Sequence, residues 1–163
     1  MDAAYLDAAV AALEDRFDPV YGGFGGAPKF PPSTTLEFLL QRMARDPAAA
    51  APRLMVELTL LRMAEGGIRD QLAGGFHRYA VDGVWGVPHF EKMLYDNALL
   101  AGVYARAHAL TGDPRWADVA ASTLDYLLRE MRVPGGAFAS AQDADTADGE
   151  GAYFTWTPAE IDA

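Results

Sequence analysis

The chain has 163 residues, and 51% of them are hydrophobic, which is enough for the core of one domain. Asp and Glu outnumber Lys and Arg by 23 to 13, and the resulting net charge of -10 repels phosphate backbones and anionic membrane surfaces. Nucleic acid is therefore not expected as a partner. Because there is no cysteine, these residues can form neither a disulfide framework nor a Cys-x-x-Cys redox site.

The N-terminus has no basic segment followed by an apolar core, and no apolar run approaches the ~18 residues that a membrane span needs. We therefore expect a cytoplasmic protein that does not bind membranes. No part of the sequence indicates a cofactor, and we assign none.

The first helix is predicted from Leu6, Ala9, Leu13 and Phe17, whose spacing of three and four residues places them on one face. Residues 18–32 follow, and they are too rich in Gly and Pro for a helix or a long strand. This loop contains a Gly-Gly-Phe-Gly-Gly run, but without the strand-to-helix context of a dinucleotide-binding motif. We interpret it as a structural turn.

Two further helices are predicted before residue 70. Thr34 and Glu37 have the spacing of a capping box that would open a helix from Leu36 to about Arg45. Another helix is expected over residues 52–64, and it ends at a Gly-Gly pair.

Residues 74–99 combine two of the three histidines with many charged and aromatic side chains, so chemistry is most expected there. The segment begins as a glycine-opened loop, and a helix is predicted from Pro88, since proline suits the first helical turn. This helix would carry His89, Glu91 and Asp96 and continue as an apolar run to Leu110, which indicates burial by neighbours on every side.

The remaining chain predicts a helix capped by Asp113 and Pro114 that extends to Met131, then a long loop, and then a helix capped by Thr157. Gly-Gly pairs at 22, 74 and 135 lie 52 and 61 residues apart, which suits repeated helical hairpins. The long loops can hold short strand pairs, for example residues 138–140 with residues 153–155.

Three motifs resemble the helical region of the spermatogenesis-associated, thioredoxin-domain-containing protein family. They are YGGFGGAPKFP, DQLAGGFHRYAVDGVWGVPHFEKMLYDNALL and FASAQDADTADGEGAYFTWTPAEI, and they occur in the family's order. The resemblance implies an (α/α)6 toroid of the six-hairpin glycosidase type, similar in layout to the N-acylglucosamine 2-epimerases. It also implies a thioredoxin-like domain upstream. We therefore expect an all-α fold in which residues 1–163 form one partial toroid domain, about half of the ring, as a fragment of a longer chain.

His77 and His89 are the first catalytic candidates, because imidazole can take or give a proton near neutral pH. Arg78 and Glu91 flank them and can orient them or stabilise developing negative charge. The alternative is that both histidines are hydrogen-bonded pins that hold the loop to the helix.

Asp143 and Asp145 are predicted to project toward the same central pocket from the loop of the next hairpin. Their segment, residues 143–150, has the oxygens for a hard cation, but its third carboxylate and its glycine each come one residue late for an EF-hand, so we predict no metal. Asp70, Asp82 and Asp96 flank the histidine segment and are further candidate carboxylates. Aromatic residues of the long loops can pack against sugar rings, and those assigned to substrate binding are Phe24, Tyr79, Trp85 and Tyr95.

Three functions remain open. The first is a sugar epimerase or isomerase in which His77 or His89 removes a proton beside a carbonyl while Arg78 steadies the enediolate. The second is a glycoside hydrolase with paired carboxylates drawn from Asp70, Glu91, Asp143 or Asp145. The third is a non-catalytic binding or scaffold domain. The expected partners are a small sugar-like substrate, the remainder of the toroid and the upstream thioredoxin-like domain.

Overall fold

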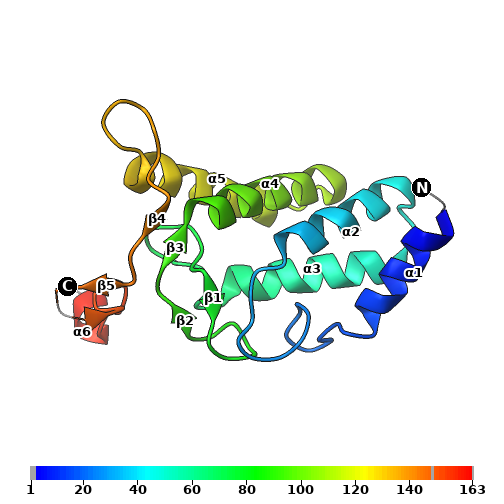
Figure 1. Cartoon of the computed structure of the whole chain (residues 1–163), viewed down its shortest axis with the longest axis horizontal. Coiled ribbons are helices and arrows are strands. Elements are labelled where there is room, and N and C mark those ends of the chain that lie inside the picture. Colours follow the sequence, from blue (N-terminus) through cyan, green and yellow to red (C-terminus); the bar gives the residue numbers. More distant parts are fainter. Residues whose placement is uncertain (1–2, 148, 163) are drawn as a thin grey trace.

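The computed structural model describes residues 3–147 and 149–162, and most of its regular structure is helical. Four long helices, α2 to α5, lie side by side, and the short strands gather at the end of this bundle where α4 begins (Figure 1). The helices are α1 (Ala3–Glu14), α2 (Ser33–Arg45), α3 (Ala50–Glu65), α4 (Leu94–Thr111), α5 (Pro114–Tyr126), which continues as the π-helix η1 (Leu127–Met131), and α6 (Pro158–Ile161).

Among the described residues, three two-stranded antiparallel ribbons form within the long loops. They pair β1 (Tyr79–Ala80) with β2 (Pro88–His89), β3 (Lys92–Met93) with β4 (Ala141–Gln142), and β5 (Asp145–Thr146) with β6 (Gly149–Glu150). The expectation of short strand pairs in the loops is confirmed, but the pair suggested for residues 138–140 and 153–155 is wrong. Instead, β4 joins the segment just before α4 and brings the C-terminal residues back to the bundle.

The core lies between α2, α3, α4 and α5, because α2 packs against both α3 and α4, and α4 packs against α5. Tyr104 is central to it, since its ring stacks on Phe76 at 5.5 Å between centroids and its hydroxyl donates to the Leu60 carbonyl oxygen at 2.8 Å. Burial without this hydrogen bond would be costly for the hydroxyl. The buried apolar residues around it include Leu36, Leu39, Leu40, Met55, Val56, Met63, Leu100, Val103, Trp116 and Val119.

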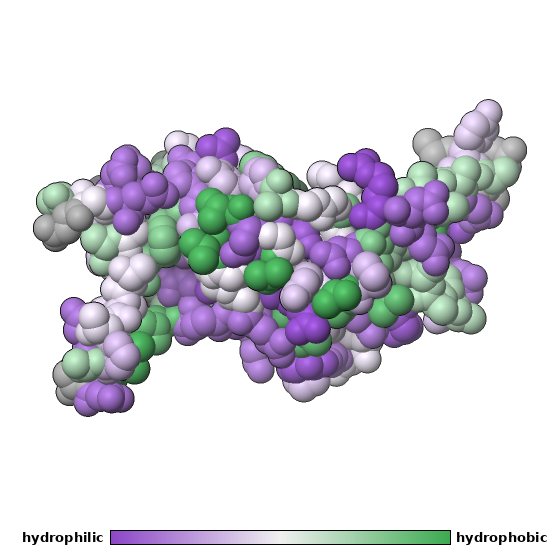
Figure 2. Space-filling view, turned by 90° about the horizontal axis from the view of Figure 1, so that it is seen from below, coloured by the Kyte–Doolittle hydropathy of each residue, from purple (hydrophilic) through white to green (hydrophobic). Residues whose placement is uncertain are grey.

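The prediction that α4 is buried on every side is wrong for the described residues. Leu99 is 49% exposed, and it lies with Gly102 and Arg106 beside α2 in a pocket of about 340 Å³. On another face of the molecule, apolar residues are interspersed with polar ones rather than joined in one patch (Figure 2). Among the described residues, no helix combines the length and apolar character that crossing a bilayer would require.

The helix predicted from Pro88 is also wrong, because α4 begins six residues later, at Leu94. The physical reason is a turn centred on Asp82, whose carboxylate accepts N–H groups from Val84, Gly86 and Val87. This turn folds the chain back, so that Pro88 pairs with Ala80 in a strand. Proline is tolerated in this short strand, because the only loss is the ladder hydrogen bond that a backbone N–H at this position would donate.

The structure confirms two predicted helix caps and contradicts a third. Asp113 accepts from the Arg115 amide at the start of α5, and Thr157 and Glu160 form a complete capping box at α6, as expected. The capping box at Thr34 is wrong, because α2 already begins at Ser33 and has no side-chain cap.

Two of the three Gly-Gly loops have the same hydrogen-bonded structure, which we call the lysine-locked loop (residues 18–24 and 70–76). In the first, Asp18 N donates to Gly23 O and Gly22 N donates to Asp18 O, at 3.0 and 2.9 Å. Lys29 Nζ then donates to Asp18 Oδ2 and Gly22 O, at 2.8 and 2.9 Å.

The second loop repeats every one of these contacts. Asp70 N donates to Gly75 O and Gly74 N to Asp70 O, at 3.0 and 3.1 Å. Lys92 Nζ donates to Asp70 Oδ2 and Gly74 O, at 2.8 and 3.0 Å. The loop at Gly135 differs, since Met131 stands where the aspartate would be. The repeat predicted from the Gly-Gly pairs is thus a repeated pattern of hydrogen bonds in two of the three loops.

Candidate functional site

The β1–β2 ribbon and its flanks hold the two candidate histidines in different surroundings. His77 is 2% exposed, and its Nδ1 lies 2.9 Å from the Phe90 carbonyl oxygen. Its ring meets Phe90 and Phe154 edge-on, at 5.2 and 5.0 Å between centroids. His77 therefore ties the loop to Phe90, the residue after β2, whereas the pin alternative placed this tie at a helix.

His77 is neutral at pH 7 in this environment. Burial lowers its pKa to about 4, and the nearby ammonium of Lys92 adds to this effect. Because a carbonyl oxygen can only accept, Nδ1 must carry the proton, and Nε2 is left with its lone pair. The ring lines a pocket of about 290 Å³ together with Asp70, Phe90, Phe154 and Trp156.

His89 lies in a more open position and has a carboxylate partner. Its Nδ1 is 2.7 Å from Glu150 Oε1, its ring stacks on Tyr79 at 4.9 Å, and its side chain is 27% exposed. A carboxylate on Nδ1 fixes the tautomer and leaves Nε2 able to take a proton. This is the arrangement of a base with an orienting partner.

Arg78 and Glu91 stand beside His89 and complete what we call the His89 cluster: His89, Glu150, Glu91, Arg78 and Tyr79. Arg78 Nη1 donates to Glu91 Oε2 at 2.7 Å, and the same oxygen lies 3.8 Å from His89 Nε2. The main chain reinforces this pair, since the Arg78 amide donates to the Glu91 carbonyl oxygen at 2.8 Å. Three of the predicted catalytic residues are therefore brought together.

Asp96, in the first turn of α4, has an unusual carboxyl group near this cluster. Burial raises its pKa to about 6, and the negative charge of Glu91 also raises it, while Arg78 partly opposes the shift. Tyr95, the adjacent predicted binding residue, is half exposed on the same turn. The sequence showed Asp96 only as a flanking carboxylate, because its burial depends on how the loops cover the start of α4.

Two predicted binding residues pack against other loop residues instead, Trp85 buried and Phe24 partly buried. Trp85 is fully buried, and its indole N–H donates to the Tyr21 carbonyl oxygen at 2.8 Å. Phe24 packs against Phe17 at 5.9 Å between ring centroids. Trp85 therefore holds the loops together, and its full burial corrects its assignment to substrate binding.

Asp143 and Asp145 are exposed, and Asp145 lies opposite Glu150 in the β5–β6 ribbon, so its backbone adjoins the His89 cluster. Asp143 Oδ1 accepts from the Asp145 amide at 3.1 Å. Within residues 3–147 and 149–162 no group of three or more acidic or histidine side chains could hold a metal ion. Asp148, which belonged to the weighed cation motif, lies outside the described residues.

The sequence interpretation missed Glu150 as a partner of His89, since it considered that carboxylate only as a cation ligand. Its position depends on the C-terminal arm, defined as residues 143–162 without Asp148. Phe154 of this arm stacks on Phe90 at 5.8 Å, and Gly151 approaches the same ring so closely that a Cβ would lie 2.5 Å from it. These contacts dock the arm beside both histidines.

Comparison with known proteins reveals close relatives along nearly the whole chain. Spermatogenesis-associated protein 20 is 45% identical in Homo sapiens and 44% in Mus musculus, over 91% of this chain in each case. An uncharacterized protein of Caenorhabditis elegans is 37% identical over the same share. The chain spans about a fifth of the length of these relatives. No protein-family model matches the chain.

Solved structures with a similar fold include two sugar epimerases and an isomerase. Cellobiose 2-epimerase from Spirochaeta thermophila aligns with a TM-score of 0.74 and 22% identity, covering 86% of this chain and 39% of that one. A sugar epimerase from a ruminal bacterium aligns with a TM-score of 0.72 and 15% identity, covering 82% of this chain and 37% of that one. D-mannose isomerase aligns with a TM-score of 0.53 and 20% identity, covering 70% of this chain and 29% of that one. At these identities the likeness concerns the fold, whereas the sequence matches carry the relationship: the chain is homologous to one segment of spermatogenesis-associated protein 20, as its three motifs indicated.

Proposed function

We propose that this chain supplies the acid–base groups of a carbohydrate-active domain that epimerises or isomerises an open-chain sugar. The observation that carries the proposal is the 2.7 Å contact between His89 Nδ1 and Glu150 Oε1, which leaves Nε2, 3.8 Å from Glu91 Oε2, as the ring nitrogen that can take a proton. The fold likeness to sugar epimerases and isomerases supports the same reaction class by analogy.

In the proposed reaction, His89 Nε2 removes the proton from the carbon beside the sugar carbonyl. The electron pair of that C–H bond moves into the carbonyl group and forms an enediolate. Arg78 keeps one terminal nitrogen on Glu91 and offers the rest of its guanidinium to the negative oxygen. Return of a proton to the same carbon from the other face gives the epimer. Return to the neighbouring carbon, with transfer of the hydroxyl proton from the second oxygen to the first, gives the isomer.

Asp96 is the proposed source of the returning proton. With a pKa of about 6 its carboxyl is partly protonated near neutral pH, which suits a general acid. Glycoside hydrolysis is less well supported, because Asp70 is paired with Lys92 and Glu91 with Arg78, while Asp143 and Asp145 are exposed.

We further propose that the rest of the full-length protein completes an (α/α)6 ring and adds the thioredoxin-like domain. The chain's coverage of 39% and 37% of the two epimerase chains supports a partial ring. A partial ring expressed alone should bind a hydrophobic dye or self-associate, whereas the full-length protein should do neither. Dye binding that is equal for both would contradict the partial ring.

The catalytic proposal is tested by following exchange of the sugar C2 hydrogen with deuterated water in the full-length protein. We expect His89→Gln to slow exchange by about 100-fold or more, the usual contribution of a positioned base. His108→Gln is the matched control, since His108 lies roughly 18 Å along α4 from Asp96 and binds the Asp113 carbonyl oxygen. Equal exchange in the two variants, or none in the unmodified protein, would favour a binding or scaffold role.

A further inference from the structure

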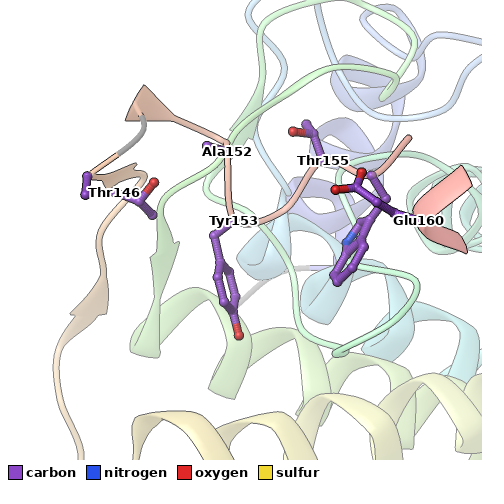
Figure 3. A pocket seen from close by; sticks show the side chains of 7 residues that line it. Thr146, Ala152, Tyr153, Thr155 and Glu160 are labelled. Atoms are coloured by element: carbon purple, nitrogen blue, oxygen red, sulfur yellow. The ribbon is translucent and has the colours of Figure 1, made fainter. Parts of the chain in front are cut away.

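The C-terminal arm presents two large aromatic side chains to solvent at one pocket. Tyr153 and Trp156 are 59% and 54% exposed, and both line a cavity of about 470 Å³. Thr146 lies on one side of this pocket and Glu160 on the other, with Tyr153 between them (Figure 3). The volume falls within the usual range of about 300–1,000 Å³ for ligand pockets.

Phe154, between these two aromatics in sequence, packs in the opposite direction. Its ring lies 5.0 Å from His77 and 5.8 Å from Phe90. The arm therefore has an anchoring face, made by Phe154, and an open face, made by Tyr153 and Trp156. Since the anchor is provided by Phe154, the two exposed rings are not needed to dock the arm.

The polar groups of the pocket are held in place by their own hydrogen bonds. Thr155 Oγ1 donates to Gly151 O at 3.2 Å, and Thr146 Oγ1 donates to Gly149 O at 3.1 Å, so both hydroxyl oxygens can still accept. Glu160 Oε2 accepts from the amide and hydroxyl of Thr157, at 2.8 and 2.7 Å. Aromatic faces with fixed acceptors around them suit a ligand that has apolar faces and many hydroxyl groups.

Trp156 connects this pocket with a second one. It lines both the 470 Å³ pocket and the 290 Å³ pocket that contains His77. Glu150, the partner of His89, belongs to the same arm. The open pocket, the pocket that contains His77 and the carboxylate that orients His89 therefore all adjoin the same arm, so a ligand longer than one ring can contact the arm at more than one of these places.

We propose that the pocket between Tyr153 and Trp156 is a subsite for a second sugar ring, so that the substrate is a disaccharide or longer oligosaccharide. This inference rests on the proposed function, because it places the reacting ring at His89. The second ring stacks on Trp156 and Tyr153, while its hydroxyl groups donate to Thr146, Thr155 and Glu160.

The test compares the affinities of glucose and its disaccharide cellobiose for the full-length protein by titration calorimetry. We expect Trp156→Ala and Tyr153→Ala each to lower the ratio of cellobiose to glucose affinity by about tenfold, and Trp156→Phe to restore most of it. Tyr5→Ala is the matched control, because Tyr5 is 74% exposed on α1 and takes no part in the pocket. Its ratio should equal that of the unmodified protein.

The subsite is overturned if the ratio stays unchanged in both alanine variants, if both sugars lose affinity equally, or if cellobiose does not bind. Failure of the proposed function looks different. In that case no sugar exchanges its C2 hydrogen, yet the cellobiose preference still depends on Trp156, and the pocket remains a carbohydrate-binding site.

Discussion

Lys92 and Asp70 form a buried ion pair in which Nζ lies 2.8 Å from Oδ2, with the lysine side chain fully buried. The ammonium also lies 4.3 Å from the centre of the Tyr126 ring. Burial raises the pKa of Asp70, but the hydrogen bonds from Lys92 and from two backbone amides outweigh this and hold that pKa below its usual range. Both groups are thus retained as charges inside the loop.

Removing Lys92 should therefore be costly. We expect Lys92→Met to lower the free energy of unfolding by about 3–5 kcal/mol, because Asp70 would remain as an uncompensated buried charge. Lys29→Met should cost less, since Asp18 is twice as exposed as Asp70. Chemical denaturation measures both. The double variant Lys92→Met with Asp70→Asn should recover at least about 1 kcal/mol, and a double variant no more stable than the single one would contradict the charge argument.

Gly75 tests the close approach of the second loop to α5. Its φ is +78°, and an added Cβ would lie 2.5 Å from a Tyr126 ring carbon. Gly25 has a similar φ of +82° but open space around it. We expect Gly25→Ala to cost about 1–2 kcal/mol for the backbone conformation, and Gly75→Ala to cost about 1–3 kcal/mol more for the collision. Equal melting temperatures for the two variants would contradict this expectation.

His77 should make the protein less stable as the pH falls. Its pKa is about 4 in the folded chain and 6.5 in the unfolded chain, so between these values the unfolded chain binds more protons. The loss approaches about 3 kcal/mol below pH 4. His77→Asn should remove this dependence, whereas His108→Gln should keep it. Thermal unfolding from pH 7 to pH 4 provides the measurement, and an unchanged slope in His77→Asn would show that His77 is not the group responsible.

Asp96 should have the opposite effect on how stability depends on pH. Its pKa is about 6 in the folded chain against 3.8 unfolded, so stability falls as the pH rises from 4 to 6 and the carboxylate becomes charged while partly buried. We expect Asp96→Asn to gain about 1–2 kcal/mol at pH 7 and nothing at pH 4. Between pH 4 and pH 6, His77 and Asp96 have opposite effects on stability. Replacing either residue with Asn should therefore leave the pH dependence that the other one causes. A gain at pH 4 equal to that at pH 7 would contradict this assignment.

Local signals in the sequence were sufficient for much of the fold. The caps at Asp113 and Thr157 were predictable because each acts on amides two or three residues away. Pro88 was misread because the turn at Asp82 decides its conformation. The difference between the two histidines was not predictable, since Phe154 buries His77 and Glu150 orients His89 from a segment far along the chain.

The two lysine-locked loops differ in what they enclose. The aspartate and lysine are 11 residues apart in the first loop and 22 in the second. The lock therefore tolerates insertions, because its contacts join only the ends of the enclosed segment. Between Phe24 and Lys29 there are four residues, whereas the span from Phe76 to Lys92 accommodates the β1–β2 ribbon with His77, Arg78, His89 and Glu91. The first lysine-locked loop thus shows that the lock can close around a short segment without reactive side chains. Grafting residues 25–28 in place of residues 77–91 would keep the second lock and remove His77, Arg78, His89 and Glu91.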